Sequence, residues 1–239
     1  MGRARIETSY DFIDLGASSG GSLVWAAKAF GGTGLGVDLS EEKAAAARAT
    51  GHRMLVADAR DIKLADGSVR FCTALDFLEH LPSIEDAGAV IQSAVRLARD
   101  FVFIALPNFD NEALLRQIKL KRYYTDWSGH SLHLRTTQLD EMLQATGHTA
   151  RVFRYGEMFD TWDRSIIPLS APRNSSFYDP GSFDPKPFQI LPRKKIYQRT
   201  LAVLVKRPDL SINEILMQAV ITLGYLQGMG DKRDRDSGS

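Results

Sequence analysis

The chain has 239 residues, with 30 Lys and Arg against 29 Asp and Glu, a formal net charge of +1, and 44% hydrophobic residues. These values are ordinary for a globular protein and exclude a global basic field that would attract nucleic acid. The single cysteine, Cys72, excludes an intramolecular disulfide framework and suits a reducing compartment. No apolar stretch approaches the ~18 residues of a membrane span, and no signal peptide precedes the first predicted strand. We therefore expect a cytoplasmic protein without membrane insertion.

A short apolar strand at residues 12–15 runs into a loop rich in Gly and Ser, and a helix follows from about Leu23. Gly16 allows a sharp turn, and Gly20 and Gly21 allow a ligand to approach the backbone where the helix begins. The free N–H groups of that helix start favour a carboxylate or a phosphate. The pattern predicts a site for a nucleotide-type cofactor after the first strand.

Asp14 discriminates between cofactors. An acid two residues before the first Gly would repel the pyrophosphate of a dinucleotide, whereas it would attract a ligand that carries an ammonium group. The stretch from Asp14 to Gly20 resembles motif I, D/E-x-G-x-G-x-G, of the class I S-adenosylmethionine (SAM)-dependent methyltransferases, with Ser18 in place of the middle Gly. The resemblance extends to about residue 155. It implies SAM as the cofactor and S-adenosylhomocysteine as the product.

The second predicted strand, residues 35–39, carries an acid at its carboxyl end. Asp38 follows Gly16 at the distance expected of a carboxylate that accepts both ribose hydroxyls. The alternative is that Asp38 only caps the next helix, beside Ser40. Position and neighbouring motif together favour the ribose role.

The third predicted strand, residues 53–57, and the fourth, residues 69–75, are each followed by further acids. The resemblance implies that Asp58 and the Ala59 backbone hold the adenine, and that the Leu75 backbone faces the methionine part; Asp61 is left to pair with Arg60 or Lys63. The stretch from Asp76 to Leu81 resembles the E-V-L-E-H-L segment of the small-molecule branch called methyltransferase type 11. The full predicted set of cofactor contacts is Asp14, Gly16, Ser18, Gly20, Asp38, Leu39, Asp58, Ala59 and Leu75.

The later elements continue the alternation of helix and strand. Helices are predicted at 84–98 and 137–147, and strands at 101–106, 149–155 and 200–205. This alternation predicts a mainly parallel sheet with helices on both faces. The resemblance adds a Rossmann-like three-layer sandwich with seven strands, the last of them antiparallel at the edge, and an aromatic insertion before that strand.

Two segments interrupt this core, at residues 108–135 and 156–199. They hold many aromatic and basic side chains and six of the prolines, and interruptions of this length are usually functional or disordered. Their aromatic content argues against disorder, so we interpret them as a substrate cover. The alternative is that Trp162, Phe177 and Phe183 plug the edge of the sheet as ordinary core.

Three histidines are candidates for a general base if the acceptor needs deprotonation: His80, His130 and His133, with Tyr123 and Tyr124 as weaker candidates. Two roles are open for His80: it faces the substrate as a base, or it only forms a hydrogen bond with the adjacent loop. His130 and His133 lie close to Asp126 in the sequence, but nothing specifies further ligands, so no metal is predicted. The basic run at 193–195 is more typical of solvated surface than of a nucleic-acid site.

The sequence divides into a methyltransferase domain at 1–207, an amphipathic helix at 208–228 and a charged tail at 229–239 that we expect to be disordered. Ser211 and Glu214 form a capping-box pattern at the start of the helix. The helix packs either on the sheet or on a second subunit, which would make a homodimer.

The predicted function is transfer of the SAM methyl group to an oxygen, nitrogen or carbon nucleophile of a small or medium-sized acceptor. Because the leaving group is already activated, alignment of the partners can supply most of the catalysis, and no nucleophile motif is required. The alternatives are a SAM-binding regulatory or scaffold protein without turnover, an RNA-directed methyltransferase, and a nicotinamide oxidoreductase. Asp14 and the missing second Gly count against the last of these.

Overall fold

The structure of the chain is a computed structural model that describes residues 10–187 and 195–223. Its centre is a seven-stranded sheet in the order β3-β2-β1-β4-β5-β9-β7. The strands are β1 (Phe12–Leu15), β2 (Gly34–Asp38), β3 (Met54–Val56), β4 (Val69–Leu75), β5 (Ala98–Pro107), β7 (Thr149–Met158) and β9 (Ile196–Val205). Only β9 pairs antiparallel to its neighbours, β5 and β7. The predicted Rossmann-like fold is confirmed.

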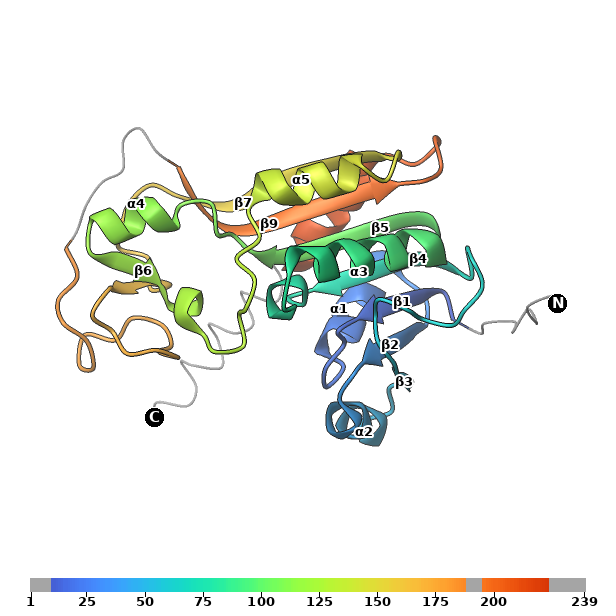
Figure 1. Cartoon of the computed structure of the whole chain (residues 1–239), viewed down its shortest axis with the longest axis horizontal. Helices are drawn as coiled ribbons and strands as arrows, with labels where there is room; N and C mark the ends of the chain where they lie inside the picture. The colour runs from blue at the N-terminus through green and yellow to red at the C-terminus, as the bar shows by residue number, and fades with distance from the viewer. Residues whose placement is uncertain (1–9, 188–194, 224–239) are drawn as a thin grey trace.

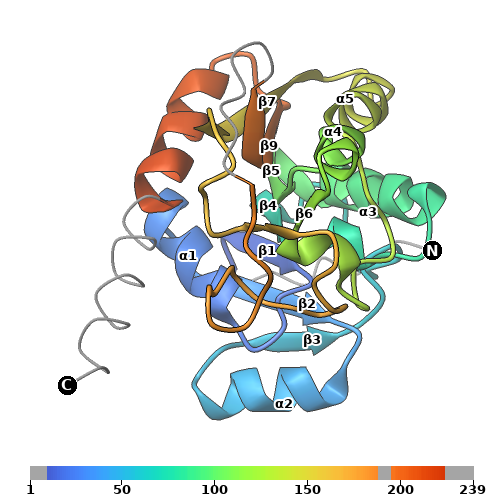
Figure 2. The ribbon, with the colours of Figure 1, turned by 90° about the vertical axis from the view of Figure 1, so that its left-hand side faces the viewer.

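The two faces of the sheet are covered by different helices, which gives three layers (Figure 2). One face carries α3 (Ile84–Leu97) and α5 (Thr136–Gln144), which pack against the inner side chains of β1, β4 and β5. The other carries α1 (Gly21–Phe30), α2 (Glu41–Ala49) and the helix at 212–223. Because both faces are buried, the central strands are continuous apolar runs.

The predicted place of the last strand was wrong. β9 lies between β5 and β7, and β7 forms the edge. The burial of the two strands explains this order, since all residues from Thr200 to Val205 are buried whereas β7 exposes Arg151 and Arg154. A strand that is apolar on both faces needs neighbours on both sides, and charged residues are typical of an edge.

The C-terminal helix packs on the sheet. Ser211 caps it by accepting a hydrogen bond from the Glu214 N–H, and Ile215 and Ala219 are buried in the core beside α1. Met217 and Ile221 remain exposed. Association with a second subunit stays a prediction, and Leu226 and the tail at 229–239 lie outside the described residues.

The two interruptions of the core meet beyond the carboxyl ends of β5 and β7 (Figure 1). The first contains α4 (Glu112–Gln117), β6 (Leu120–Arg122) and a 3-10 turn (Tyr123–Asp126); the second contains β8 (Ile166–Pro168). Strands β6 and β8 pair antiparallel. A small apolar core joins both segments, made of Leu115, Leu120, Met158, Ile166 and Ile196. We call this joined unit, residues 108–135 and 159–187, the cover.

Its boundaries differ from those expected, because β7 continues to Met158 and β9 already begins at Ile196. The aromatic side chains of the second segment do not plug the sheet. Trp162 is 72% exposed and Phe177 is 49% exposed, while Phe183 is partly buried. Phe188 and the basic residues Arg193 and Lys194 lie outside the described residues.

Cys72 lies on β4 and is fully buried, and this burial raises the pKa of its thiol. It therefore serves as a small core residue. Among the residues that the structure describes, no helix combines the length and the apolarity that crossing a bilayer requires.

Candidate functional site

A cavity of about 500 Å³ lies at the carboxyl ends of β1, β2, β3 and β4. Of the nine predicted cofactor contacts, six line it: Gly16, Ser18, Asp38, Leu39, Asp58 and Ala59. The rest of the wall comes from Val37, Lys43, Ala57, Arg60, Asp76, Phe77, His80, Leu81, Pro82 and Val90. Asp14, Gly20 and Leu75 do not line it. The loops after four parallel strands thus converge where sheets of this kind bind ligands.

The loop after β1 needs small residues for steric reasons. Gly16 has φ +71, and a Cβ there would lie 2.2 Å from the Phe77 ring. Gly20 has φ +97, and a Cβ there would lie 2.4 Å from the His52 ring. Ser18, which replaces the middle Gly of the motif, also takes a left-handed conformation at φ +49. The loop therefore keeps the shape of a glycine loop despite the substitution.

Asp14 lies beneath this loop and does not face the cavity. It is fully buried, and its carboxylate accepts hydrogen bonds from Thr73 Oγ1 at 2.7 Å and from Ser22 Oγ. Burial raises the pKa of Asp14 to about 7. The side chain joins β1 to β4 and to the first turn of α1, which is a different place from the direct ammonium contact that the sequence suggested.

Asp38 borders the cavity with a half-buried carboxylate. Oδ2 accepts from the Ser18 N–H at 2.9 Å, and Oδ1 accepts from the Ser40 N–H at 2.9 Å. The side chain of Ser40, and not that of Asp38, caps α2 by accepting from Lys43 N. Because a carboxylate offers about four acceptor sites, two remain for a ligand. The arrangement fits a pair of ribose hydroxyls.

Asp58 also borders the cavity, where Arg60 donates to it through its backbone and guanidinium groups. These bonds hold the pKa of Asp58 below its ordinary value. Arg60 also pairs with Asp86, whereas Asp61 pairs with Lys63.

A second cavity, of about 740 Å³, lies between the sheet and the cover. Asp76 and His80 line both cavities, so the two meet at the loop after β4. Tyr123, Trp127 and Phe177 form an aromatic wall, in which the Tyr123 and Phe177 rings are 4.5 Å apart. The charged lining residues are Asp76, Glu79, Arg122, Asp163, Arg164 and Arg199.

The three histidines separate into a pair and an outlier. His80 and His130 line the second cavity, with ring centroids 4.9 Å apart. Nδ1 of His80 lies 2.8 Å from the Gly129 carbonyl oxygen, and Nδ1 of His130 lies 2.8 Å from that of Tyr124. A carbonyl can only accept, so both neutral rings carry the proton on Nδ1 and the lone pair on Nε2. Burial and the neighbouring His80 lower the pKa of His130.

His133 does not line either cavity. Its ring stacks on Phe109 at 4.6 Å and its Nδ1 lies 3.0 Å from Glu112, whose hydrogen bond raises the pKa of His133. Of the predicted bases, the structure therefore brings His80 and His130 together and leaves His133 outside.

Glu79 is a site residue that the sequence reasoning missed. It is fully buried, both carboxylate oxygens lack a hydrogen-bond partner, and burial followed by the nearby Asp76 raises its pKa to about 8. Ligand atoms of Glu79, His80 and His130 lie within 4.8 Å of one another, so these side chains are the group that could hold a cation. The signal in the sequence was that Glu79 directly precedes His80 in the segment that resembles type 11 methyltransferases.

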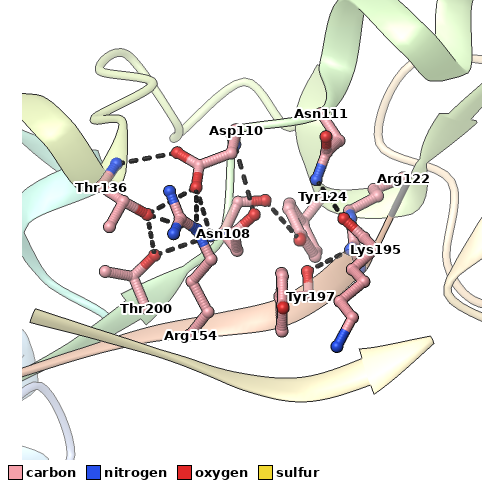
Figure 3. A network of polar contacts seen from close by, with 10 residues as sticks. All are labelled: Asn108, Asp110, Asn111, Arg122, Tyr124, Thr136, Arg154, Lys195, Tyr197 and Thr200. Carbon is pink, nitrogen blue, oxygen red and sulfur yellow. Dashed lines mark hydrogen bonds and ion pairs between the residues drawn. The ribbon is translucent and has the colours of Figure 1, made fainter. Parts of the chain in front are cut away.

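A polar network fixes the cover to the sheet (Figure 3). Asn108, after β5, donates to Thr200 Oγ1 on β9 at 3.0 Å, and Asp110 accepts from Thr136 N and Arg154 Nε. Tyr124 Oη donates to the Asn108 carbonyl at 3.0 Å. These hydrogen bonds fix the position of the cover relative to the sheet, and the second cavity lies between the two.

The comparisons with known proteins agree with this geometry. Residues 13–103 match the family described as Methyltransferase domain, of type 11. This segment carries β1 to β4, the glycine loop and the shared Asp76 and His80. The chain contains a class I SAM-dependent methyltransferase domain.

Solved structures of methyltransferases share the fold at low identity. A SAM-dependent methyltransferase from Archaeoglobus fulgidus is 16% identical, with a TM-score of 0.57 over 84% of this chain and 88% of that one. A putative methyltransferase of Haloferax volcanii, in complex with the Trm112 activator, is 17% identical, with a TM-score of 0.54 over 82% of each chain. A possible histamine N-methyltransferase from Thermotoga maritima is 14% identical, with a TM-score of 0.52 over 83% of each. No curated protein sequence matches the chain.

Proposed function

We propose that this methyltransferase binds SAM in the cavity of about 500 Å³ and methylates a small or medium-sized acceptor in the cavity of about 740 Å³. The observation that carries the proposal is that Asp76 and His80 line both cavities. A methyl group and its acceptor must be within contact distance for direct displacement. The volume of the second cavity lies in the range of small-molecule sites.

The residues of the first cavity have separable roles in this proposal. Asp38 accepts the ribose hydroxyls, Asp58 and the Ala59 backbone hold the adenine, and the loop at Gly16 and Ser18 leaves room for the methionine part. Asp14 acts through the loop, because it anchors Ser22 and Thr73 beneath it. When bound, SAM supplies an activated sulfonium methyl group.

His80 is the proposed general base for an oxygen or nitrogen acceptor. The Gly129 carbonyl fixes its tautomer and leaves Nε2 free to accept a proton. His130, held in the same tautomer by Tyr124, lies beside it and is the second candidate. For a carbon nucleophile the same ring could remove the proton after methyl transfer.

The test is a screen of metabolite extracts with SAM that carries an isotopically labelled methyl group. The expected result is label in a small molecule together with formation of S-adenosylhomocysteine, both lost in Asp38→Ala. Tight binding of S-adenosylhomocysteine with no label in any small molecule would contradict the proposed activity and favour a regulatory protein. Label in RNA would identify the RNA-directed alternative.

A further inference from the structure

The second cavity contains a buried positive charge that no carboxylate of the described residues pairs with directly, although the guanidinium lies 5.6 Å from the centre of the Tyr124 ring. Arg122 on β6 is 2% exposed and lines the cavity. Its Nη2 donates to the Tyr197 carbonyl, whereas its Nη1 is buried without a hydrogen-bond partner (Figure 3). A buried charged donor without a partner is costly, so its retention needs an explanation.

Neighbouring cations show that the fold provides partners elsewhere. Lys121, which precedes Arg122, has a side chain 3% exposed and an Asp126 oxygen 2.7 Å away. Arg199, partly buried in the same cavity, pairs with Asp76 at 2.6 Å, although its Nε is buried without a hydrogen-bond partner. No carboxylate of the described residues comes within 4.0 Å of the Arg122 nitrogen atoms.

The acids around the cavity do not supply the missing charge. Asp76 is taken by Arg199, and Asp163 accepts from Gln198 and from the Ser165 N–H. Burial raises the pKa of Glu79 to about 8, which leaves it largely neutral at pH 7. With Arg164 at the exposed rim, the lining has an excess of positive charge.

We propose that the methyl acceptor is an aromatic carboxylic acid whose carboxylate is held by Arg122. A guanidinium presents a planar fork of donors that matches a carboxylate. The aromatic wall of Tyr123, Trp127 and Phe177 offers a surface on which the ring stacks. A single uncompensated guanidinium matches a monoanion better than a phosphate ester with its higher charge.

This inference rests on the proposed function and names the substrate class for its second cavity. The acceptor atom would be a hydroxyl or amino group on the ring, within reach of His80. Proton removal by His80 Nε2 and displacement at the sulfonium carbon would give the methylated acid, S-adenosylhomocysteine and one proton.

The experiment is calorimetry on the full chain saturated with S-adenosylhomocysteine. The probes are benzoate, 4-hydroxybenzoate and 2-aminobenzoate, each compared with its own primary amide, and phenyl phosphate. We expect the best acid to bind at least tenfold more tightly than its amide. In Arg122→Gln this preference falls below threefold, Arg122→Lys keeps an intermediate preference, and the exposed control Arg151→Gln behaves as wild type.

The wild-type comparison of acid with amide needs no variant, so it decides the matter even if Arg122→Gln fails to fold. Equal binding of every acid and its amide overturns the proposal, as does a preference that survives in a folded Arg122→Gln. Tighter binding of phenyl phosphate than of any acid overturns the carboxylate assignment. Failure to bind S-adenosylhomocysteine would instead refute the proposed function.

Discussion

The two cavities are built by different means, and the difference separates what is general in this protein from what is particular to it. The first cavity, which we propose holds the cofactor, consists of short loops after adjacent parallel strands; glycines shape these loops, and carboxylates accept hydrogen bonds from backbone N–H groups. The second cavity, which we propose holds the acceptor, is bounded by two segments far apart in the sequence, joined by β6 and β8 and by a shared apolar core. The first is set by local geometry and the second by tertiary packing. Changes in one should therefore leave the other largely intact.

The largest expected effect is in the cofactor loop. Gly16→Val should abolish binding of S-adenosylhomocysteine, because its Cβ would lie 2.2 Å from the Phe77 ring at a φ of +71. Calorimetry measures the loss, and circular dichroism checks the fold. Gly31→Val is the matched control, since Gly31 has φ +72 but no atom within 4 Å of a Cβ, and it should keep wild-type affinity. Normal binding by a folded Gly16→Val would show that the loop does not shape the cofactor site.

The next effect should appear only in transfer. Replacing His80 by Ala should lower the rate of methyl transfer about 10²- to 10⁴-fold, the usual contribution of a general base, with cofactor affinity changed less than a few-fold. The rate is measured with an acceptor from the labelled-methyl screen. His133→Ala is the control, because His133 stacks on Phe109 away from both cavities. If His133→Ala loses as much activity as His80→Ala, the base has been misassigned.

A moderate effect should follow from the ribose contact. Asp38→Ala removes charge-assisted hydrogen bonds of about 1.5–3 kcal/mol, so affinity for S-adenosylhomocysteine should fall about 10- to 150-fold. The same change frees the Ser18 N–H, which shares in the loss. Glu42→Ala, on the exposed side of α2, should bind as wild type. Unchanged affinity in a folded Asp38→Ala would remove Asp38 from the site.

A further effect concerns the pH dependence of stability and comes from Glu79 in the second cavity. The pKa of Glu79 is raised from 4.5 to about 8 in the folded state, so between these pH values the folded chain binds more protons than the unfolded one. Stability then falls as pH rises through this window, by up to about 1.4 kcal/mol per pH unit. Glu79→Gln removes the dependence, whereas the contribution of Asp14 is common to both proteins and cancels.

Urea unfolding at pH 5, 7 and 9 measures the difference. Relative to wild type, Glu79→Gln should become more stable as the pH rises from 5 to 9, and the exposed control Glu42→Gln should not. Parallel pH curves for wild type and Glu79→Gln would contradict a neutral buried Glu79.

The same contrast explains how far the sequence could predict the structure. The strands and loops of the cofactor half follow from local signals: apolar runs, glycines at tight turns and an acid at each strand end. Six of the nine predicted contacts line that cavity, whereas Asp14, Gly20 and Leu75 do not. The sequence does not show that the Asp14 carboxylate is buried beneath the loop. The interior position of the last strand could also have been predicted, because an apolar run such as Thr200 to Val205 is typical of a central strand.

For the second cavity, the sequence predicted which segments surround it but not how they pack. The aromatic residues indicated a cover, but the pairing of Arg122 with Ile166 across β6 and β8 joins residues 44 positions apart, and no local pattern specifies it. Glu79 and Arg122 matter through their burial, which depends on neighbours from several elements. The same holds for the histidines, because only the fold brings His80 beside His130 and leaves His133 behind Phe109.

The most direct test of two separable cavities is a loop replacement in the cover. Exchanging residues 170–194 for a Gly/Ser linker of about 10 residues removes Phe177 but keeps β8, which pairs with β6. Thermal unfolding checks that the variant folds, and calorimetry and methyl transfer are then measured on the same preparation. Affinity for S-adenosylhomocysteine should stay within about threefold of wild type, and methyl transfer should fall at least 100-fold. A folded variant that methylates its acceptor at the wild-type rate, or that loses the cofactor, would contradict the separation of the two cavities.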